Sequence, residues 1–175
     1  MDKLYALQQP NKGLSWFPGG SADPWISQYV LGSFGQMKQA GLLHTSKLND
    51  DRFSRFILEL AGYCDQQYLK PRMNLNPIPF LELLWSRSYW LNESPLDSGM
   101  RAVADSFIYR QWNRVSQLSL NRQALLIIVT TRYYQPDHSL YFKALELAGS
   151  IREQAVEDPV NGVRWKSFSD QEELT

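Results

Sequence analysis

Large apolar residues recur every three to four positions along most of the chain, and this spacing predicts α-helices. The first run begins after Asp23-Pro24, an N-cap residue followed by a proline at the first helical position, and it ends at Gly41. It predicts a helix over about residues 24–40. The expected apolar face consists of Trp25, Ile26, Tyr29, Val30, Phe34 and Met37.

Five further periodic runs predict five more helices. The second begins at Asn49-Asp50 and ends near residue 70, before Pro71. Asn76-Pro77 and Ser94-Pro95 repeat the cap-then-proline pattern and introduce the third and fourth helices. Ser119 and Asp137 can cap the fifth and sixth, and the sixth extends to about Ala155.

These runs predict an all-α fold, with antiparallel helical hairpins stacked side by side in a single domain over residues 1–175. The β-branched cluster Ile127-Ile128-Val129-Thr130-Thr131 favours a strand by composition alone. It lies within a periodic segment of helical length, however, and no alternation surrounds it. We therefore expect it to be helical.

Two segments rich in glycine and aromatic residues lie outside these runs. Between Gln9 and Gly20 turn-forming residues alternate with large aromatics, which predicts an ordered loop whose Trp16 and Phe17 fill a core. A similar pattern, Asn161-Gly162-Val163-Arg164-Trp165, occurs near the end of the sequence. The pair is either a weak internal repeat of a hairpin array or two unrelated turns.

The composition of the chain excludes several classes of function. The chain is 43% hydrophobic with six tryptophans, which is enough apolar material for a substantial core. Its 18 basic and 18 acidic residues leave no positive excess, so a nucleic-acid partner is not expected. No apolar run approaches the roughly 20 residues that span a bilayer. The single cysteine cannot form an internal disulfide.

The sequence predicts no catalytic, cofactor-binding or metal-binding residues. His44 and His138 are far apart and lack the spacing of a zinc site. Asp50-Asp51 is better explained by a helix N-terminus, which favours acidic residues, than by a magnesium-binding pair. Gly32 and Gly35 lie within a predicted helix, where paired glycines allow close helix packing rather than phosphate binding.

Cys64 lies three residues before Gln67, the spacing that can close an internal thioester. It also continues an apolar face four residues after Leu60, and a free cysteine is among the most frequently buried residue types. We therefore expect Cys64 to be a buried, unreactive thiol.

Several segments together resemble the bacterial alpha-2-macroglobulin family, in the helical domain that follows the thioester motif. The most specific part of the resemblance runs from Trp16-Phe17-x-Gly19-Gly20 to Tyr29-Val30 and Gly32-x-Phe34-Gly35. The remaining matching segments, in the family's order, are Gln9-Pro10-Asn11, Trp85-Ser86-Arg87-Ser88-Tyr89-Trp90, residues 123–132, Ala144-Leu145 through Ile151-Arg152-Glu153, and Gly162-Val163-Arg164-Trp165-Lys166.

The resemblance implies a section of an α/α toroid in a large cell-envelope protein that traps proteases, in the periplasm or at the cell surface. Such proteins offer a bait to a protease, change shape when cut, and enclose it. The expected partners are proteases, through the parent protein, and neighbouring domains of the same chain. An exposed apolar edge of the section is also expected to cause self-association.

The chain departs from the family pattern at two places. In that family the Cys-x-Glu-Gln thioester motif precedes the tryptophan-rich loop, whereas Cys64 follows it and Gln66 stands where glutamate is expected. Cys64 therefore does not inherit the thioester role. Lys12 replaces a glycine that is common in the family, which affects the local turn.

Two other classes of function remain open from the residues alone. One is an α/α-toroid enzyme acting on glycans or isoprenoids, with residues such as Tyr133, Tyr134 and His138 lining a cleft. The other is a module that binds a protein or peptide on an aromatic face. An enzyme needs a cleft with titratable groups of shifted pKa, whereas a protease trap needs none.

Overall fold

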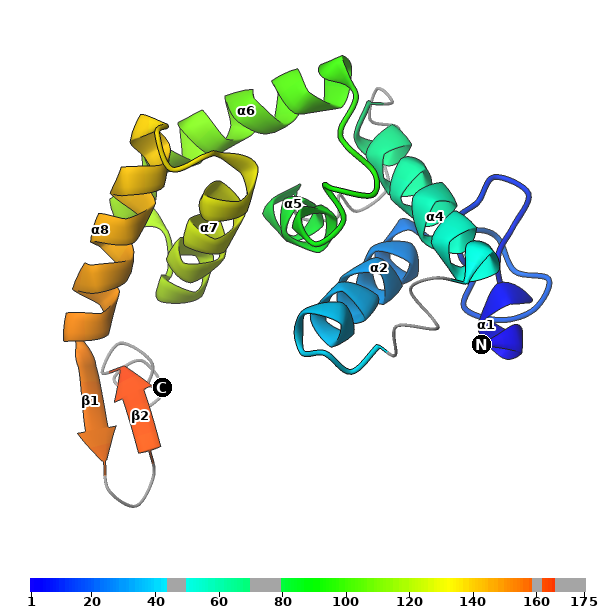
Figure 1. Ribbon diagram of the computed structural model, residues 1–175, viewed down its shortest axis with the longest axis horizontal. Coiled ribbons are helices and arrows are strands. Elements are labelled where there is room, and N and C mark those ends of the chain that lie inside the picture. Colours follow the sequence, from blue (N-terminus) through cyan, green and yellow to red (C-terminus); the bar gives the residue numbers. More distant parts are fainter. Residues whose placement is uncertain (44–49, 70–79, 159–161, 166–175) are drawn as a thin grey trace, which may run out of the picture. The chain divides into compact units, whose positions relative to one another are not determined.

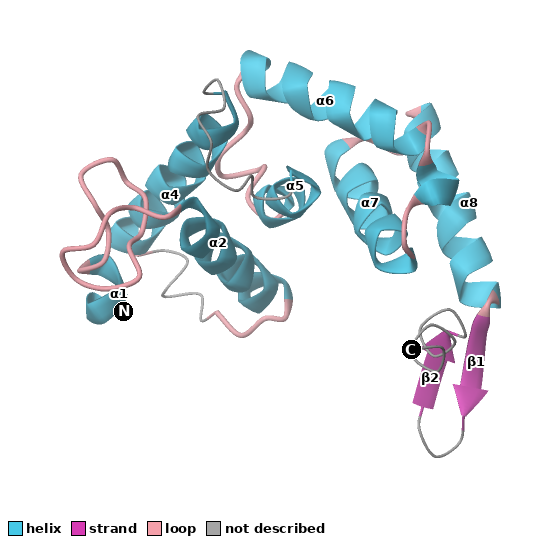
Figure 2. Ribbon diagram, turned by 180° about the vertical axis from the view of Figure 1, so that it is seen from behind, coloured by secondary structure: helices cyan, strands magenta, loops and turns pink. Residues whose placement is uncertain are grey.

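The computed structural model describes residues 1–43, 50–69, 80–158 and 162–165. They belong to two compact units, Met1–Phe107 and Ile108–Thr175, and each is described by itself. The described residues form seven α-helices, one short 3₁₀ helix and one two-stranded sheet (Figures 1 and 2). The predicted all-α fold class is therefore confirmed.

In the first unit, α2 packs against both α4 and α5, and α4 also contacts α5 (Figure 1). The core is made of large apolar side chains such as Leu31, Phe53, Leu60 and Leu84, all buried. The helices of this unit are α1 (Asp2–Tyr5), α2 (Pro24–Gln39), α4 (Asp51–Leu69), α5 (Phe80–Ser88) and the first part of α6 (Ser98–Trp112).

Acidic N-caps begin three of these helices. Asp23 accepts hydrogen bonds from the backbone N–H groups of Trp25 and Ile26, at 2.8 and 3.1 Å, which confirms the predicted start of α2. The Asp50 carboxylate caps α4 in the same way, so it is a helix cap as expected. Helix α6 begins later than Ser94-Pro95 suggested, because Asp97 caps it through the Met100 N–H. The predicted start at Asn76-Pro77 lies outside the described residues.

Two glycines set the distance between α2 and α5. A Cβ atom on Gly32 would lie 2.8 Å from the Ser86 hydroxyl, and one on Gly35 would lie 2.4 Å from the Tyr89 ring. These separations are too short for any side chain larger than hydrogen. Gly32 and Gly35 therefore permit close helix packing, as predicted.

A buried ion pair joins α4 to α5. The Arg87 side chain is fully buried, and its Nε donates to the Asp65 carboxylate at 2.8 Å. Its Nη2 donates to the Ser94 carbonyl oxygen, also at 2.8 Å, in the segment that leads to α6. A buried guanidinium needs such partners because its removal from water is costly. Arg87 thus fixes three segments of the unit at one point.

In the second unit, α7 (Leu120–Tyr133) and α8 (Ser139–Glu153) lie side by side and run in opposite directions (Figure 1). The 3₁₀ helix η1 (Val115–Gln117) precedes them. The β-branched cluster 127–131 is helical, as predicted, because α7 includes it. Trp112 Nε1 donates to Thr130 Oγ1 at 2.8 Å and ties the end of α6 to α7.

The end of the chain departs from the predicted helix and turn. Helix α8 ends at Glu153, and β1 (Ala155–Asp158) pairs with β2 (Gly162–Trp165) in antiparallel register. Ala155 lies opposite Trp165, so the predicted end of the sixth helix belongs to a strand. Asn161 lies outside the described residues.

Two predicted caps also differ. Ser119 occupies the N-cap position of α7 but makes no side-chain cap hydrogen bond. The N-cap of α8 is His138 rather than Asp137, and its side chain accepts from the Leu140 N–H. Across the described ranges, no helix is both long and apolar enough to cross a bilayer.

Candidate functional site

Three aromatic rings stack on one another at the surface of the first unit, and we refer to Trp16, Trp25 and Tyr29 as the aromatic stack. The Trp16 and Trp25 ring centroids are 5.4 Å apart with an interplanar angle of 13°, and those of Trp25 and Tyr29 are 5.4 Å apart at 6°. All three side chains are more than half exposed, at 57, 52 and 59%. Adjacent Phe17 is also exposed.

The backbone beneath the aromatic stack is held by hydrogen bonds. Leu14 bridges to both Gln8 and Asp23, and its N–H donates to the Ser27 hydroxyl at 2.8 Å. The buried Ser15 hydroxyl donates to the carbonyl oxygens of Leu7 and Phe17. The rings are therefore presented by an ordered loop and by the first turns of α2.

The prediction that Trp16 and Phe17 fill a core is wrong, because both lie at the surface. The predicted apolar face of α2 is also wrong for Trp25 and Tyr29. The helix buries a face rich in small and polar residues instead: Ser27, Gln28, Leu31, Gly32, Phe34 and Gly35. Small residues let α5 approach closely, and this approach turns the large aromatics outward.

Exposed stacked aromatics are unusual on a surface that faces only water, because they leave apolar area uncovered. Indole and phenol groups combine a large apolar ring with one polar atom, and they are enriched at protein–protein interfaces for this reason. The ordered backbone under the aromatic stack lowers the entropy lost when a partner covers it. The aromatic stack therefore has the properties of an interaction surface.

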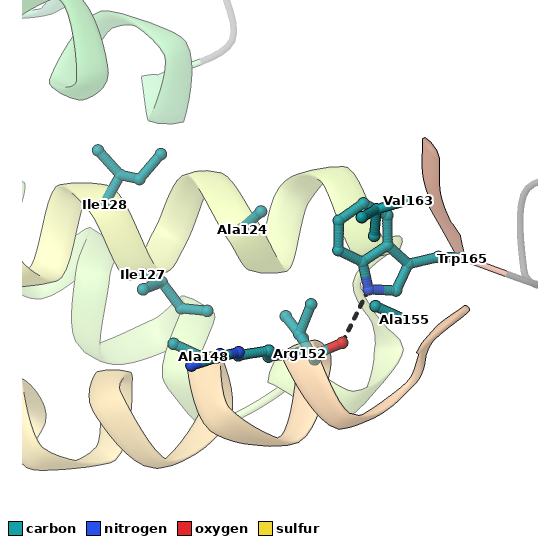
Figure 3. Close-up of a pocket in the computed structure, with 9 residues that line it drawn as sticks. Ala124, Ile127, Ile128, Ala148, Arg152, Ala155, Val163 and Trp165 are labelled. Carbon is teal, nitrogen blue, oxygen red and sulfur yellow. Dashed lines mark hydrogen bonds between the residues drawn. The ribbon is translucent and has the colours of Figure 1, made fainter. Parts of the chain in front are cut away.

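A second feature is an apolar groove in the second unit, with a volume of about 640 Å³. Helices α7 and α8 form its floor, and Val163 and Trp165 of the hairpin close one side (Figure 3). Trp165 is fixed there because its Nε1 donates to the Ile151 carbonyl oxygen at 2.7 Å, shown as a dashed line in Figure 3. The remaining lining residues are Ala124, Ile127, Ile128, Ala148, Arg152 and Ala155.

The described lining of the groove is suited to binding an apolar side chain or ligand. Arg152 is the one charged residue among the described residues that line it. A general acid or base needs a titratable group within hydrogen-bond reach of the substrate. The lining therefore offers apolar contact and one positive charge, in the size range of small-molecule pockets.

The structure places Cys64 in the core of the first unit, with no exposed surface. Burial raises the pKa of the Cys64 thiol well above its usual range, and neighbouring Asp65 raises it further while Arg87 lowers it. The Gln67 amide donates to the Tyr63 carbonyl at 3.5 Å. The predicted burial of Cys64 is thus confirmed, and its low reactivity stays a prediction.

The residues proposed for an enzyme cleft are brought together only in part. Tyr133 and Tyr134 are both buried, and of the two only Tyr134 stacks on His138, with ring centroids 4.2 Å apart. Tyr109 of α6 joins this pair through its hydroxyl, 3.3 Å from His138 Nε2. No sequence pattern indicated Tyr109, because it lies on the exposed side of its helix. None of these four side chains lines the apolar groove.

Of the other sequence candidates, Asp50 is a helix cap, and His44 lies outside the described residues. The part of the chain that the structure describes contains no group of three or more His, Cys, Asp or Glu side chains arranged to hold a metal ion. Comparisons with family models, curated proteins and solved structures find no match to this chain.

Proposed function

We propose that this chain is a non-enzymatic section of a protease trap of the bacterial alpha-2-macroglobulin type, part of an α/α toroid in a protein of the periplasm or cell surface. The observation that carries the proposal is the resemblance of the segment from Trp16-Phe17-x-Gly19-Gly20 to Gly32-x-Phe34-Gly35. In this proposal the section supplies packing surfaces to the parent protein, and the parent encloses the protease.

The properties of that segment support the proposal. Its glycines allow α2 and α5 to pack closely, and its aromatic residues form the exposed stack. A section of a larger protein is expected to expose apolar surface that neighbouring domains cover. The aromatic stack is an exposed apolar surface, and it lies in the part of the chain where the resemblance is most specific.

The positions of the residues whose pKa values are shifted favour this proposal over the enzyme alternative. Burial raises the pKa of Tyr63 to about 12, and it also raises those of Cys64 and Asp65. These three consecutive residues lie on α4, where they pack against the core or pair with buried Arg87. Structural ion pairs and core groups also shift pKa values, so these shifts do not indicate a catalytic centre.

A module that binds a protein or peptide is the second candidate, and the apolar groove favours it. The groove combines apolar walls from α7 and α8 with an indole fixed by a hydrogen bond. A peptide could place one large apolar side chain there. This candidate requires no parent protein.

The coding sequence that flanks the chain distinguishes the two candidates. The protease-trap proposal expects the same reading frame to encode further domains of a large envelope protein on both sides. A reading frame that opens and closes around these 175 residues would contradict it and leave the peptide-binding module.

The contribution of the aromatic stack can be tested in the parent protein with a matched pair of variants. Trp25→Ala removes the central ring of the stack, and Phe142→Ala removes an aromatic side chain of similar exposure on α8. Limited proteolysis should release the section faster in Trp25→Ala than in wild type or Phe142→Ala, because a covered interface has been weakened. Equal release from all three proteins would show that no neighbouring domain covers the aromatic stack.

A further inference from the structure

The imidazole of His138 caps the N-terminus of α8. His138 has the extended backbone of an N-cap residue, with φ −82° and ψ 135°, and its Nδ1 accepts the Leu140 N–H at 3.2 Å. The first N–H groups of a helix have no partner within the helix, so this hydrogen bond satisfies one of them. Only a deprotonated Nδ1 has the lone pair that the bond requires.

The other side of the ring is held by two tyrosines. Tyr134 stacks on the imidazole at an interplanar angle of 19°, and the Tyr109 hydroxyl lies 3.3 Å from Nε2. Because Nδ1 accepts, the neutral ring carries its proton on Nε2 and donates it to the Tyr109 oxygen. The contacts therefore select one tautomer of the neutral imidazole.

His138 differs in its chemistry from the other side-chain caps among the described helices. Asp23, Asp50 and Asp97 cap α2, α4 and α6 with carboxylates, which remain acceptors throughout the neutral range. Histidine changes its charge between pH 5 and 8. A protonated imidazole donates from both nitrogens, and a positive charge at a helix N-terminus is unfavourable.

We propose that His138 is an acid-sensitive helix cap: the neutral imidazole holds the first turn of α8 closed, and protonation at Nδ1 releases it. The geometry determines the direction of the pH effect. The closed state requires the deprotonated ring, whereas the open state accepts either form, so acid favours the open state. The expected change is local fraying of the first turn of α8 as the pH falls.

Two titratable side chains contact the ring: Tyr109 on α6 and Tyr134 in the connection between α7 and α8. The other charged or titratable residues near His138 in the sequence are Arg132 and Tyr133 in the last turn of α7, Asp137 in the connection, and Tyr141 and Lys143 on α8. The first turn of α8 contains no acidic residue that could compensate the new positive charge. Asp137 is exposed, so solvent screens it.

The tautomer can be observed directly by nitrogen-15 NMR of the imidazole. The chain has two histidines, so His44→Gln leaves His138 as the single imidazole to be assigned. At pH 8 we expect a deprotonated Nδ1 and a protonated Nε2, and at pH 5 two protonated nitrogens. A neutral ring protonated at Nδ1 would overturn the proposal, whatever the behaviour of any variant.

Amide hydrogen exchange tests the consequence for the helix. We expect the protection factor of the Leu140 amide, corrected for the intrinsic effect of pH, to fall by about fivefold or more between pH 8 and pH 5, the size of a typical lost N-cap. His138→Asn supplies a capping side chain that does not titrate in this range, so its Leu140 protection should stay constant. An equal pH response in wild type and His138→Asn would overturn the proposal.

A second variant separates the cap from the tyrosine contact. Tyr109→Phe removes the partner of Nε2 and leaves the bond from Leu140 to Nδ1 in place. The pH response of the Leu140 amide should persist in this variant. Its disappearance would place the acid sensitivity in the Tyr109 contact and would overturn the assignment to the cap.

Discussion

At the scale of single residues, the backbone of Lys12 adopts a conformation that side chains disfavour. Its φ is 73°, in the left-handed region, and the turn that requires this angle leads directly into buried Gly13 and Leu14. Glycine adopts such angles without steric cost. The glycine that the resemblance places at this position therefore has a physical explanation, and lysine there stores strain.

Comparing Lys12→Gly with Lys12→Ala isolates this strain. Both variants lose the surface ion pair with Glu59, in which Lys12 Nζ lies 2.9 Å from the carboxylate. Only glycine adopts this φ without strain. The free energy of unfolding should therefore be about 1–2 kcal/mol higher for Lys12→Gly than for Lys12→Ala. Chemical denaturation provides the measurement. Equal free energies of unfolding for the two variants would show that the turn does not strain the lysine.

The buried environment of Cys64 predicts an inert thiol. Because burial raises its pKa, the reactive thiolate is scarce, and the closed core also blocks access by reagents. A thiol reagent should label Cys64 only after unfolding, and the intact mass should match the unmodified chain and stay the same in methylamine. A mass lower by one ammonia that shifts when methylamine is added would reveal a thioester instead.

At the scale of elements, α2 shows how packing overrides the apolar pattern. Sequence periodicity assigned its large aromatics to the core, but the helix buries the face that carries Ser27, Gly32 and Gly35. Close approach to α5 gains contacts along both backbones, and this favours small residues at the crossing. The aromatic rings then stack on one another at the surface.

Gly35→Ala tests this crossing, and Gly62→Ala is its matched control. A Cβ at residue 35 would overlap the Tyr89 ring, so the variant should lose about 1–3 kcal/mol of stability. A Cβ at residue 62 on α4 meets no atom within 4 Å, so that variant should be unchanged or up to about 1 kcal/mol more stable. Equal stability of the two variants, measured by thermal unfolding, would rule out the close packing.

Helix positions were predictable from the sequence where a local signal determines them. The Asp23-Pro24 and Asp50 starts were found because cap hydrogen bonds depend on neighbouring residues only. The strand β1 was missed because it is four residues long and follows α8 directly, and β2 was missed because Asn161-Gly162 was interpreted as an isolated turn rather than as a hairpin signal. The aromatic stack was missed because the exposure of Trp25 depends on α5, far along the chain.

At the scale of the whole molecule, exposed apolar surface is the property that links the structure to the proposed function. The first unit exposes the aromatic stack and Phe17, and the second unit contains the apolar groove. Surfaces of this kind mark sites where a protein contacts another protein or another part of itself. A chain isolated from such partners is expected to use these surfaces to self-associate.

Light scattering tests this expectation on the isolated chain. Its apparent mass should rise with concentration, and replacing Trp25 and Tyr29 together by alanine should reduce the rise, because two rings of the stack are removed. Phe142→Ala serves as the control, since it removes exposed aromatic surface outside the stack. A strictly monomeric wild-type chain at high concentration would contradict the expectation.

The proposal that this chain is part of a protease trap is tested most directly with the full protein that contains it. An enclosed protease is still reached by small peptides but not by large proteins. After an excess of the full protein is added to an endopeptidase, we predict that cleavage of a small chromogenic peptide continues while digestion of a large protein substrate is largely lost. Unimpeded digestion of both substrates, or equal inhibition of both, would contradict the account.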